Sequence, residues 1–133
     1  MSLRSLLGAA LLALTGLAQA APLQLQVYNP GEAAVFPVSS TLISGEKDAI
    51  LVDAQFSNDE AQELVERIRA SGKRLTTIFI SHGDPDFYFG LDTLTRAYPE
   101  ARVLATAATV AYIERTRAPK LAYWGPILKD SAP

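Results

Sequence analysis

The residues with the clearest chemical potential lie together in the segment Ser81-His82-Gly83-Asp84-Pro85-Asp86. His82 is the only histidine of the chain, and Asp84 and Asp86 follow it at every second position. An extended or turning backbone would bring the imidazole and the two carboxylates towards one point. These are suitable ligands for a divalent cation, and an open coordination position would let the cation activate a water molecule. The segment is therefore a candidate metal site.

The same residues also have a purely structural explanation. Asp84 is a suitable N-cap, Pro85 fits the first position of a helix, and Asp86 in the first turn would complement the helix dipole. Phe87 then begins a series of apolar residues at helical spacing, which is typical of a core face. Residue spacing alone leaves both interpretations open.

The elements before this segment are predicted to form strands. Residues 23–29 alternate apolar and polar side chains, which indicates a strand with one wet face. The segments 35–44 and 49–54 flank the turn-forming cluster 45–48, so a β-hairpin is expected there. Residues 49–52 are apolar without alternation, which predicts an interior strand covered on both faces.

A helix is expected next, because the period of the pattern changes from two to 3.6. Ser57 and Glu60 have the spacing of a capping box, and Gly72 supplies a left-handed C-terminal cap. Residues 75–80 form a second apolar strand, so the strand, helix and strand imply a right-handed crossover and a parallel pair. One apolar helical face is made by Ala61, Leu64, Val65 and Ile68.

The alternation continues after the candidate site. We expect a helix from about residue 86 to residue 98, a strand at 102–106 and a helix at 107–115. The tail 117–133 contains three prolines and a glycine and is predicted to be irregular. The fold class is therefore α/β and layered, with an initial antiparallel hairpin followed by alternating helices and strands.

Composition and the amino-terminal segment restrict the setting of this domain. A net charge of −2 over 133 residues gives no basic excess, so a nucleic-acid partner is not expected. Arg4, the short apolar run 6–17 and the sequence Ala18-Gln19-Ala20 are typical of a signal peptide over residues 1–20. The mature domain, 21–133, is expected in the periplasm or outside the cell without stable membrane association. It has no cysteine, so its stability depends on packing, with or without metal.

The order of hairpin, capped helix, candidate site and following elements resembles the amino-terminal half of the metallo-β-lactamase fold superfamily. The similarity runs from about Val35 to Ile113 and includes Gly90-Leu91, which is similar to the glycine and leucine that follow the family motif. The resemblance implies an αββα-type fold of which only the amino-terminal half is present. Such a half is expected to belong to a longer protein, because it would leave a wide apolar sheet face in water.

In this family the loop after the corresponding strand typically reads HxHxDH, and the match is partial. His82 matches the first histidine and Asp86 the aspartate, while Asp53 is similar to a supporting aspartate near the site. Asp84 stands in place of the second histidine, and Phe87 in place of the third. The resemblance therefore implies His82, Asp84 and Asp86 as metal ligands.

These departures bear on the metal. Asp84 still offers an oxygen, whereas Phe87 has no lone pair, so a second metal position loses a ligand. The resemblance implies one divalent ion, with zinc first, although the mixed ligand set also suits manganese or iron. The alternative is that this fragment binds no metal.

Three functions follow for comparison. The favoured one is a secreted metallo-hydrolase that cleaves an ester, lactone, amide or similar bond of a small-molecule substrate, with Asp86 as a ligand or as the base that orients water. The second is a non-catalytic binding protein with a degraded metal site and an apolar pocket lined by Tyr88, Phe89, Tyr123 and Trp124. The third, a phosphotransferase using Asp84 and Asp86, is least supported, because three residues separate the strand from Asp84. Neither the substrate nor the oligomeric state follows from the sequence.

Overall fold

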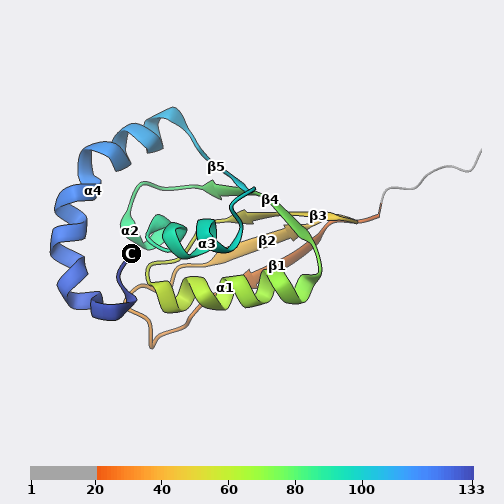
Figure 1. Ribbon diagram of the computed structural model, residues 1–133, viewed down its shortest axis with the longest axis horizontal. Coiled ribbons are helices and arrows are strands. Elements are labelled where there is room, and N and C mark those ends of the chain that lie inside the picture. The colour runs from red at the N-terminus through yellow and green to blue at the C-terminus, as the bar shows by residue number, and fades with distance from the viewer. Residues whose placement is uncertain (1–20) are drawn as a thin grey trace, which may run out of the picture.

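The computed structural model describes residues 21–133, and the predicted signal peptide lies outside these residues. One five-stranded sheet in the order β1-β2-β3-β4-β5 forms the centre of the described chain (Figure 1). Its first two pairings are antiparallel, and the β3–β4 and β4–β5 pairings are parallel. The predicted α/β class, initial hairpin and parallel crossover are therefore confirmed. The strands are β1 (Gln24–Tyr28), β2 (Ser40–Ser44), β3 (Asp48–Val52), β4 (Arg74–Ile80) and β5 (Arg102–Ala105).

Helix α1 (Asn58–Ser71) forms where the capping box predicts it. The Ser57 hydroxyl accepts a hydrogen bond from the Glu60 N–H at 3.2 Å, and the Glu60 carboxylate accepts one from the Ser57 N–H at 3.0 Å. These reciprocal bonds satisfy two of the amide groups that a helix start leaves unpaired. Gly72 ends the helix with a φ of 66°, as expected for a left-handed cap.

The core lies between one face of the sheet and the helices α1 and α3 (Leu91–Ala97). Leu42, Leu51 and Ile78 stand in register on neighbouring strands and are all buried. The predicted apolar face of α1 packs onto them, and Leu94 of α3 is also buried. This layer holds the strands whose ends carry the candidate site.

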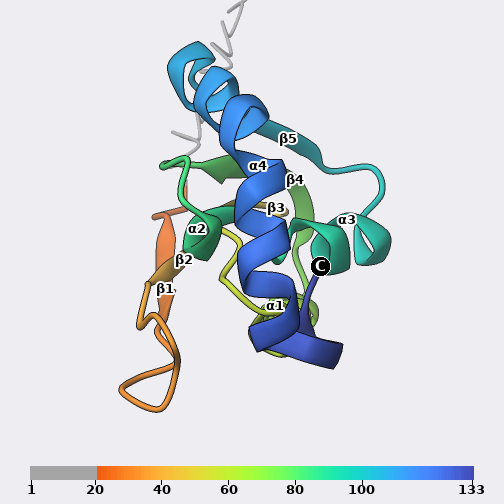
Figure 2. The ribbon, with the colours of Figure 1, turned by 90° about the vertical axis from the view of Figure 1, so that its left-hand side faces the viewer.

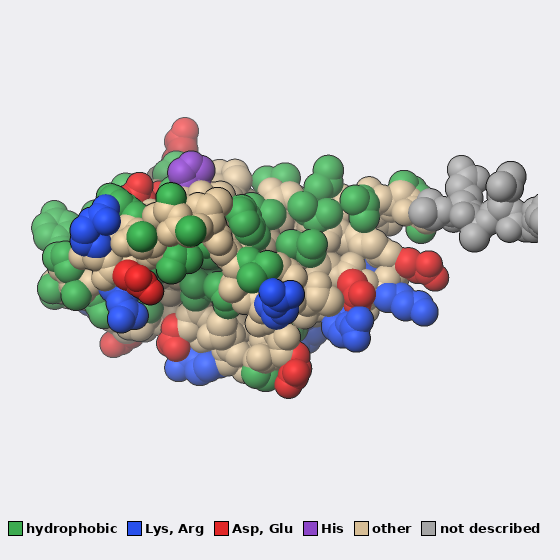
Figure 3. Space-filling view, turned by 90° about the horizontal axis from the view of Figure 1, so that it is seen from above, with side chains coloured by type: hydrophobic (Ala, Val, Ile, Leu, Met, Phe, Trp, Pro, Cys, Tyr) green, Lys and Arg blue, Asp and Glu red, His purple; other side chains and the backbone are tan. Residues whose placement is uncertain are grey.

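The opposite face of the sheet is open, which corrects the expectation that β3 is covered on both sides. Ile50 of β3 is 39% exposed, and Leu25, Val27 and Leu104 on the same face are also exposed. Hydrophobic side chains are visible over the strand region in Figure 3. The apolar run looked like a doubly covered strand because apolar residues occupy both faces, although helices of the described chain cover only one.

The predicted helix over residues 86–98 is divided into α2 (Pro85–Tyr88) and α3. The break coincides with Gly90, whose N–H donates to the Gln55 carbonyl at 3.0 Å. A side chain at this position would collide with the carbonyl oxygen of Ala54. Close contact with the β3–α1 loop therefore requires glycine and turns the chain between two short helices.

The prediction of an irregular tail is wrong, because α4 (Ala107–Leu128) continues through Pro119 and Pro126 and is followed by a 3-10 turn at Lys129–Ser131. Proline removes a helical hydrogen bond and crowds the preceding turn, so an end near Arg115 was the simpler expectation. None of the helix's residues is fully buried. Figures 1 and 2 show α4 as an arc beside the carboxyl ends of the parallel strands. Because the helix is exposed, proline can bend it without disturbing the core.

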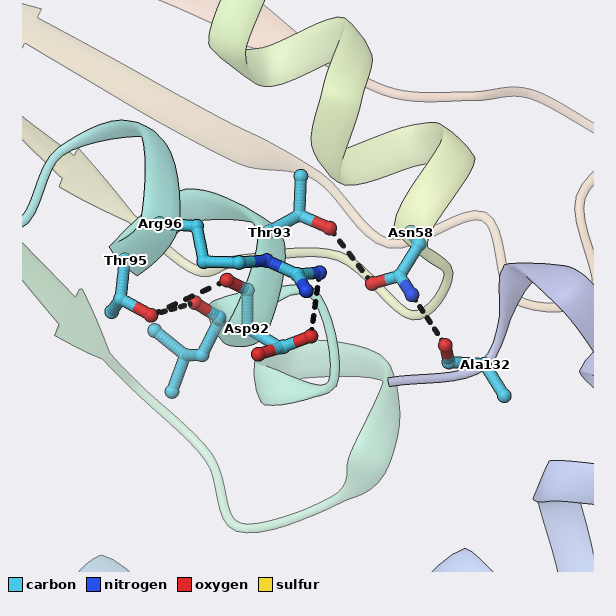
Figure 4. A network of polar contacts seen from close by, with 7 residues as sticks. Asn58, Asp92, Thr93, Thr95, Arg96 and Ala132 are labelled. Atoms are coloured by element: carbon cyan, nitrogen blue, oxygen red, sulfur yellow. Dashed lines mark hydrogen bonds and ion pairs between the residues drawn. The ribbon is translucent and has the colours of Figure 1, made fainter.

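The last residues return to the beginning of α1. The Asn58 side chain donates to the Ala132 carbonyl and accepts from the Thr93 hydroxyl at 2.9 Å, so it joins α1, α3 and the carboxyl-terminal segment (Figure 4). The Asp59 N–H donates to the Ser131 hydroxyl at 3.1 Å. Within residues 21–133, no helix is both long and apolar enough to cross a membrane.

Candidate functional site

The candidate site lies at the carboxyl ends of β3 and β4, the edge where α/β sheets usually carry functional groups. The β3–α1 loop begins with Asp53, and the β4–α2 loop contains residues 81–84. The Ala54 N–H donates to the Phe87 carbonyl at 2.8 Å, so the backbone joins the β3–α1 loop to α2, the helix that directly follows the β4–α2 loop. This contact places the supporting aspartate suggested by the family resemblance beside the segment with the predicted ligands.

Asp53 and Gln55 both have positive φ angles, 66° and 71°, and both are buried. Such conformations cost non-glycine residues about 1–3 kcal/mol each and concentrate at functional sites. The Gln55 amide compensates in part by donating to the Val38 carbonyl at 3.0 Å and the Ser40 hydroxyl at 2.8 Å. The β3–α1 loop is therefore held in a fixed, strained shape.

The Asp53 carboxylate turns towards Ser81. One oxygen accepts from the Ser81 N–H at 2.8 Å, and the other accepts from the Ser81 hydroxyl at 2.6 Å. The Ser81 oxygen in turn lies 2.7 Å from Nδ1 of His82. The Phe87 ring, at the position of the family's third histidine, packs against the imidazole with a centroid distance of 4.5 Å. Phe87 therefore contacts a predicted ligand without being able to act as one.

Asp84 occupies the N-cap position of α2, yet its side chain makes no capping hydrogen bond. Its carboxylate instead forms an ion pair with Lys120 of α4 at 2.9 Å. The Lys120 ammonium also donates to the Gly83 carbonyl at 3.1 Å and lies 4.4 Å from the centre of the Tyr112 ring. Helix α4 therefore contacts the candidate loop and holds one of the predicted ligands.

Asp86 lies in the first turn of α2 and is half-buried. Burial raises the pKa of its carboxyl above the ordinary value of 3.8, its own backbone N–H lowers it, and the negative charge of Asp84 raises it further. The positive charges of Lys120 and His82 act in the opposite direction. The net effect is a raised pKa for the Asp86 carboxyl. Carboxyl groups at functional sites commonly have raised pKa values.

The side chains supply the right atoms for a divalent cation but are not assembled as a metal centre. Among residues 21–133, no three histidine, cysteine or acidic side chains are grouped so that they could hold an ion. Asp84 is paired with Lys120, and the charges of Asp84, Lys120 and His82 all act on the Asp86 carboxyl. The ligand set of His82, Asp84 and Asp86 remains a prediction.

Sequence reasoning gave the side chains of Ser81 and Lys120 no part in the candidate metal site. The sequence shows that Ser81 directly precedes His82. Its hydrogen bond to Asp53, however, joins residues 28 positions apart. Lys120 is 36 positions from Asp84 and lies in the tail that was expected to be irregular. The sequence carries no local signal for either contact.

A hollow of about 490 Å³ lies between α4 and the two short helices. The predicted aromatic pocket is found only in part. Tyr88 and Phe89 line the hollow, whereas Tyr123 is exposed and Trp124 packs edge-on against Phe36 and Phe56. The remaining lining residues are Leu91, Asp92, Arg117, Ala118, Leu121 and Pro133.

Comparison with protein-family models tests the family membership that the sheet and the candidate loop suggest. The model of the metallo-β-lactamase superfamily matches residues 33–131. The chain belongs to the metallo-β-lactamase superfamily. This membership confirms the predicted family.

Solved metallo-β-lactamases share the fold. FIM-1 from Pseudomonas aeruginosa, solved in a mono-zinc form, superposes with a TM-score of 0.55 and 14% identity over 71% of this chain and 42% of its own. A metallo-β-lactamase of Cronobacter sakazakii has a TM-score of 0.51 and 30% identity over 59% of this chain and 30% of its own. YobT of Bacillus subtilis, described as uncharacterized, is 31% identical over 71 residues, 53% of this chain and 30% of its own. The chain therefore spans 30–42% of the length of these three relatives.

The Cronobacter protein is described by a HARLDQ motif. Like His82 to Phe87 of this chain, that motif has histidine first and aspartate fifth, and it departs from HxHxDH at the third and sixth positions. The substitutions at Asp84 and Phe87 therefore have a parallel within the superfamily.

Proposed function

We propose that the chain contributes to a secreted, metal-dependent hydrolase that cleaves an ester, lactone, amide or similar bond in a small-molecule substrate. One observation carries the proposal: in a chain of this superfamily, the exposed imidazole of His82 is held at the strand ends by Ser81 and Asp53, four positions before the half-buried carboxyl of Asp86. A bound divalent cation would supply an activated water there, and zinc is favoured because a similar protein was solved with it.

Each residue has a separate part in this proposal. His82 is the nitrogen ligand, and Asp86 is either a ligand or the base that orients water, because burial moves its pKa towards the range useful for proton transfer. Asp84 can serve as an oxygen ligand only after its ion pair with Lys120 opens. The arrangement described above does not assemble all three, so we assign no reaction step to the ion.

The proposal is tested on the full-length protein, purified without a chelator or a histidine tag. Metal content is measured by mass spectrometry, and hydrolysis of chromogenic esters, lactones and amides is followed before and after chelation. We expect bound zinc and a chelator-sensitive activity that His82→Ala removes. Gln62→Ala, on the exposed side of α1, serves as the control and should change neither. Full activity in a metal-free protein would refute the hydrolase proposal.

The hollow beside α4 favours a second candidate, a non-catalytic module that binds an apolar ligand. Its apolar walls include Phe89 and Leu121, and Phe87 replaces a histidine ligand nearby. This candidate predicts that a fluorescent hydrophobic probe binds with equal affinity before and after chelation, and that Leu121→Arg abolishes the binding. Probe binding without turnover of any substrate would favour it over the hydrolase.

Secretion forms a separate part of the proposal and rests on the sequence of residues 1–20. Expression of the full-length protein in a Gram-negative host, followed by cell fractionation and amino-terminal sequencing, tests it. We expect a periplasmic product that begins at Ala21. Recovery of an uncleaved product in the cytoplasm would contradict secretion without affecting the proposed chemistry.

A further inference from the structure

Three polar side chains form a continuous hydrogen-bonded line from the buried carboxyl end of β3 to the surface. The Asp53 carboxylate, which is 6% exposed, accepts from the Ser81 hydroxyl at 2.6 Å, and the Ser81 oxygen lies 2.7 Å from Nδ1 of the exposed His82. The Ser81 N–H also donates to the second Asp53 oxygen at 2.8 Å, which fixes the carboxylate in its plane. Both contacts of the line are as short as strong hydrogen bonds to charged or hydroxyl groups.

The direction of each hydrogen bond follows from the groups themselves. A carboxylate has no hydrogen to give, so the single hydrogen of the Ser81 hydroxyl must point to Asp53. The Ser81 oxygen can then only accept from the imidazole. Nδ1 of His82 must therefore carry the hydrogen in the neutral ring, which leaves the lone pair on Nε2.

We propose that Asp53, acting through Ser81, fixes the tautomer of His82 and makes Nε2 the only electron-pair donor of its neutral ring. Asp53 and Ser81 are positioning residues, because neither needs to touch a substrate or an ion. The Phe87 ring, packed at 4.5 Å, limits rotation of the imidazole out of this line. That Nε2 serves a metal ion depends on the proposed function, whereas the tautomer itself depends only on these contacts.

The tautomer can be measured directly, because the chain contains one histidine. The ring nitrogens of the 15N-labelled, metal-free full chain, purified without a histidine tag, would be observed by NMR. The spectra would be recorded at an alkaline pH at which they no longer change with pH, so that only the neutral ring is observed. We expect a protonated Nδ1 and an unprotonated Nε2. A hydrogen on Nε2 in the folded wild-type protein would overturn the proposal.

Asp53→Asn provides the decisive variant. Its side-chain oxygen can still accept from the Ser81 N–H, but its amide nitrogen would donate to the Ser81 oxygen, and the hydroxyl hydrogen would then turn to Nδ1 of His82. We therefore expect the hydrogen of the ring to move to Nε2. Asparagine tolerates the positive φ of this position, so the backbone is preserved. An unchanged tautomer in the folded variant would refute control by Asp53.

Two variants of Ser81 test the proposal even if the Asp53→Asn variant does not fold. Ser81→Thr retains the hydroxyl and should keep the wild-type tautomer, whereas Ser81→Ala should give a mixture of both. A purely structural role for Ser81 predicts no difference between the two ring spectra, and that result would refute the relay. Because no ion is present, these outcomes are separate from success or failure of the hydrolase proposal.

Discussion

Replacement of Gly90 by alanine tests the contact between the β3–α1 loop and the junction of α2 and α3. The new methyl group would collide with the carbonyl oxygen of Ala54 and lie 2.7 Å from Cβ of Ala61, where carbon atoms normally approach to about 3.5–4.0 Å. Two backbone hydrogen bonds cross the same contact, from Gly90 to Gln55 and from Ala54 to Phe87. The methyl group fits only if the β3–α1 loop and the α2–α3 junction move apart.

The cost follows from these contacts. Overpacking a well-filled interior usually costs about 1–3 kcal/mol, and the upper end applies because a backbone carbonyl cannot rotate away as a side chain does. Loss of one crossing hydrogen bond adds about 1 kcal/mol, which the smaller entropy of the unfolded alanine chain offsets by a similar amount. The net loss is therefore about 3 kcal/mol, a large part of the roughly 5–15 kcal/mol of a typical domain.

Urea unfolding followed by far-ultraviolet circular dichroism measures this loss. Gly45→Ala is the matched control, because its added methyl group would make only ordinary contacts, at 3.7 Å to the Asp48 carbonyl oxygen and 3.8 Å to Leu23, and its φ does not lie in the left-handed region. The control should leave stability unchanged or raise it by up to about 1 kcal/mol. If Gly90→Ala stays within about 0.5 kcal/mol of the wild type, a general threshold for neutral substitutions, the proposed contact is wrong.

Three further changes have defined outcomes. Ser57→Ala should lower the free energy of unfolding by about 1 kcal/mol through loss of the N-cap, and an unchanged thermal midpoint would contradict this. Lys120→Ala should cost about 1 kcal/mol or less yet tighten zinc binding measured by calorimetry, because Asp84 is released; equal or weaker binding would count against Asp84 as a ligand. Because burial raises the pKa of Asp86, its protonated form favours folding, and this contribution is present below pH 3.8 and lost as the pH rises through the higher folded pKa. Asp86→Asn should therefore stabilise the protein at neutral pH but not below pH 3.8. If the thermal midpoints of the variant and the wild type differ by the same amount at every pH, the raised pKa of Asp86 is disproved.

The features that could be predicted from the sequence are those encoded by neighbouring residues. The capping box of Ser57 and Glu60 and the left-handed Gly72 each depend on a few adjacent positions, so the limits of α1 followed directly. The parallel pairing of β3 and β4 followed from the short connections of a strand, helix and strand unit. The family resemblance then indicated that the loop containing His82 corresponds to the metal-binding loop of the superfamily.

The remaining features depend on tertiary contacts between distant segments. The division between α2 and α3 arises because Gly90 meets the β3–α1 loop, which local periodicity does not record. Pro119 predicted a helix end, but an exposed helix can bend around proline without loss of core packing. The pairing of Asp84 with Lys120 likewise needs α4 to arch back over the strand ends.

Helix α4 packs on the core through the partly buried Ile113, Trp124 and Leu128 and contacts the candidate loop through Tyr112 and Lys120, and none of its residues is fully buried. Little apolar surface must be wetted to lift it, so its detachment requires less free energy than unfolding of the sheet. Its amide hydrogens should exchange with heavy water well before those of β3 and β4. Detachment would also carry Lys120 away from Asp84, so the open state would leave this carboxylate available to a dissolved ion.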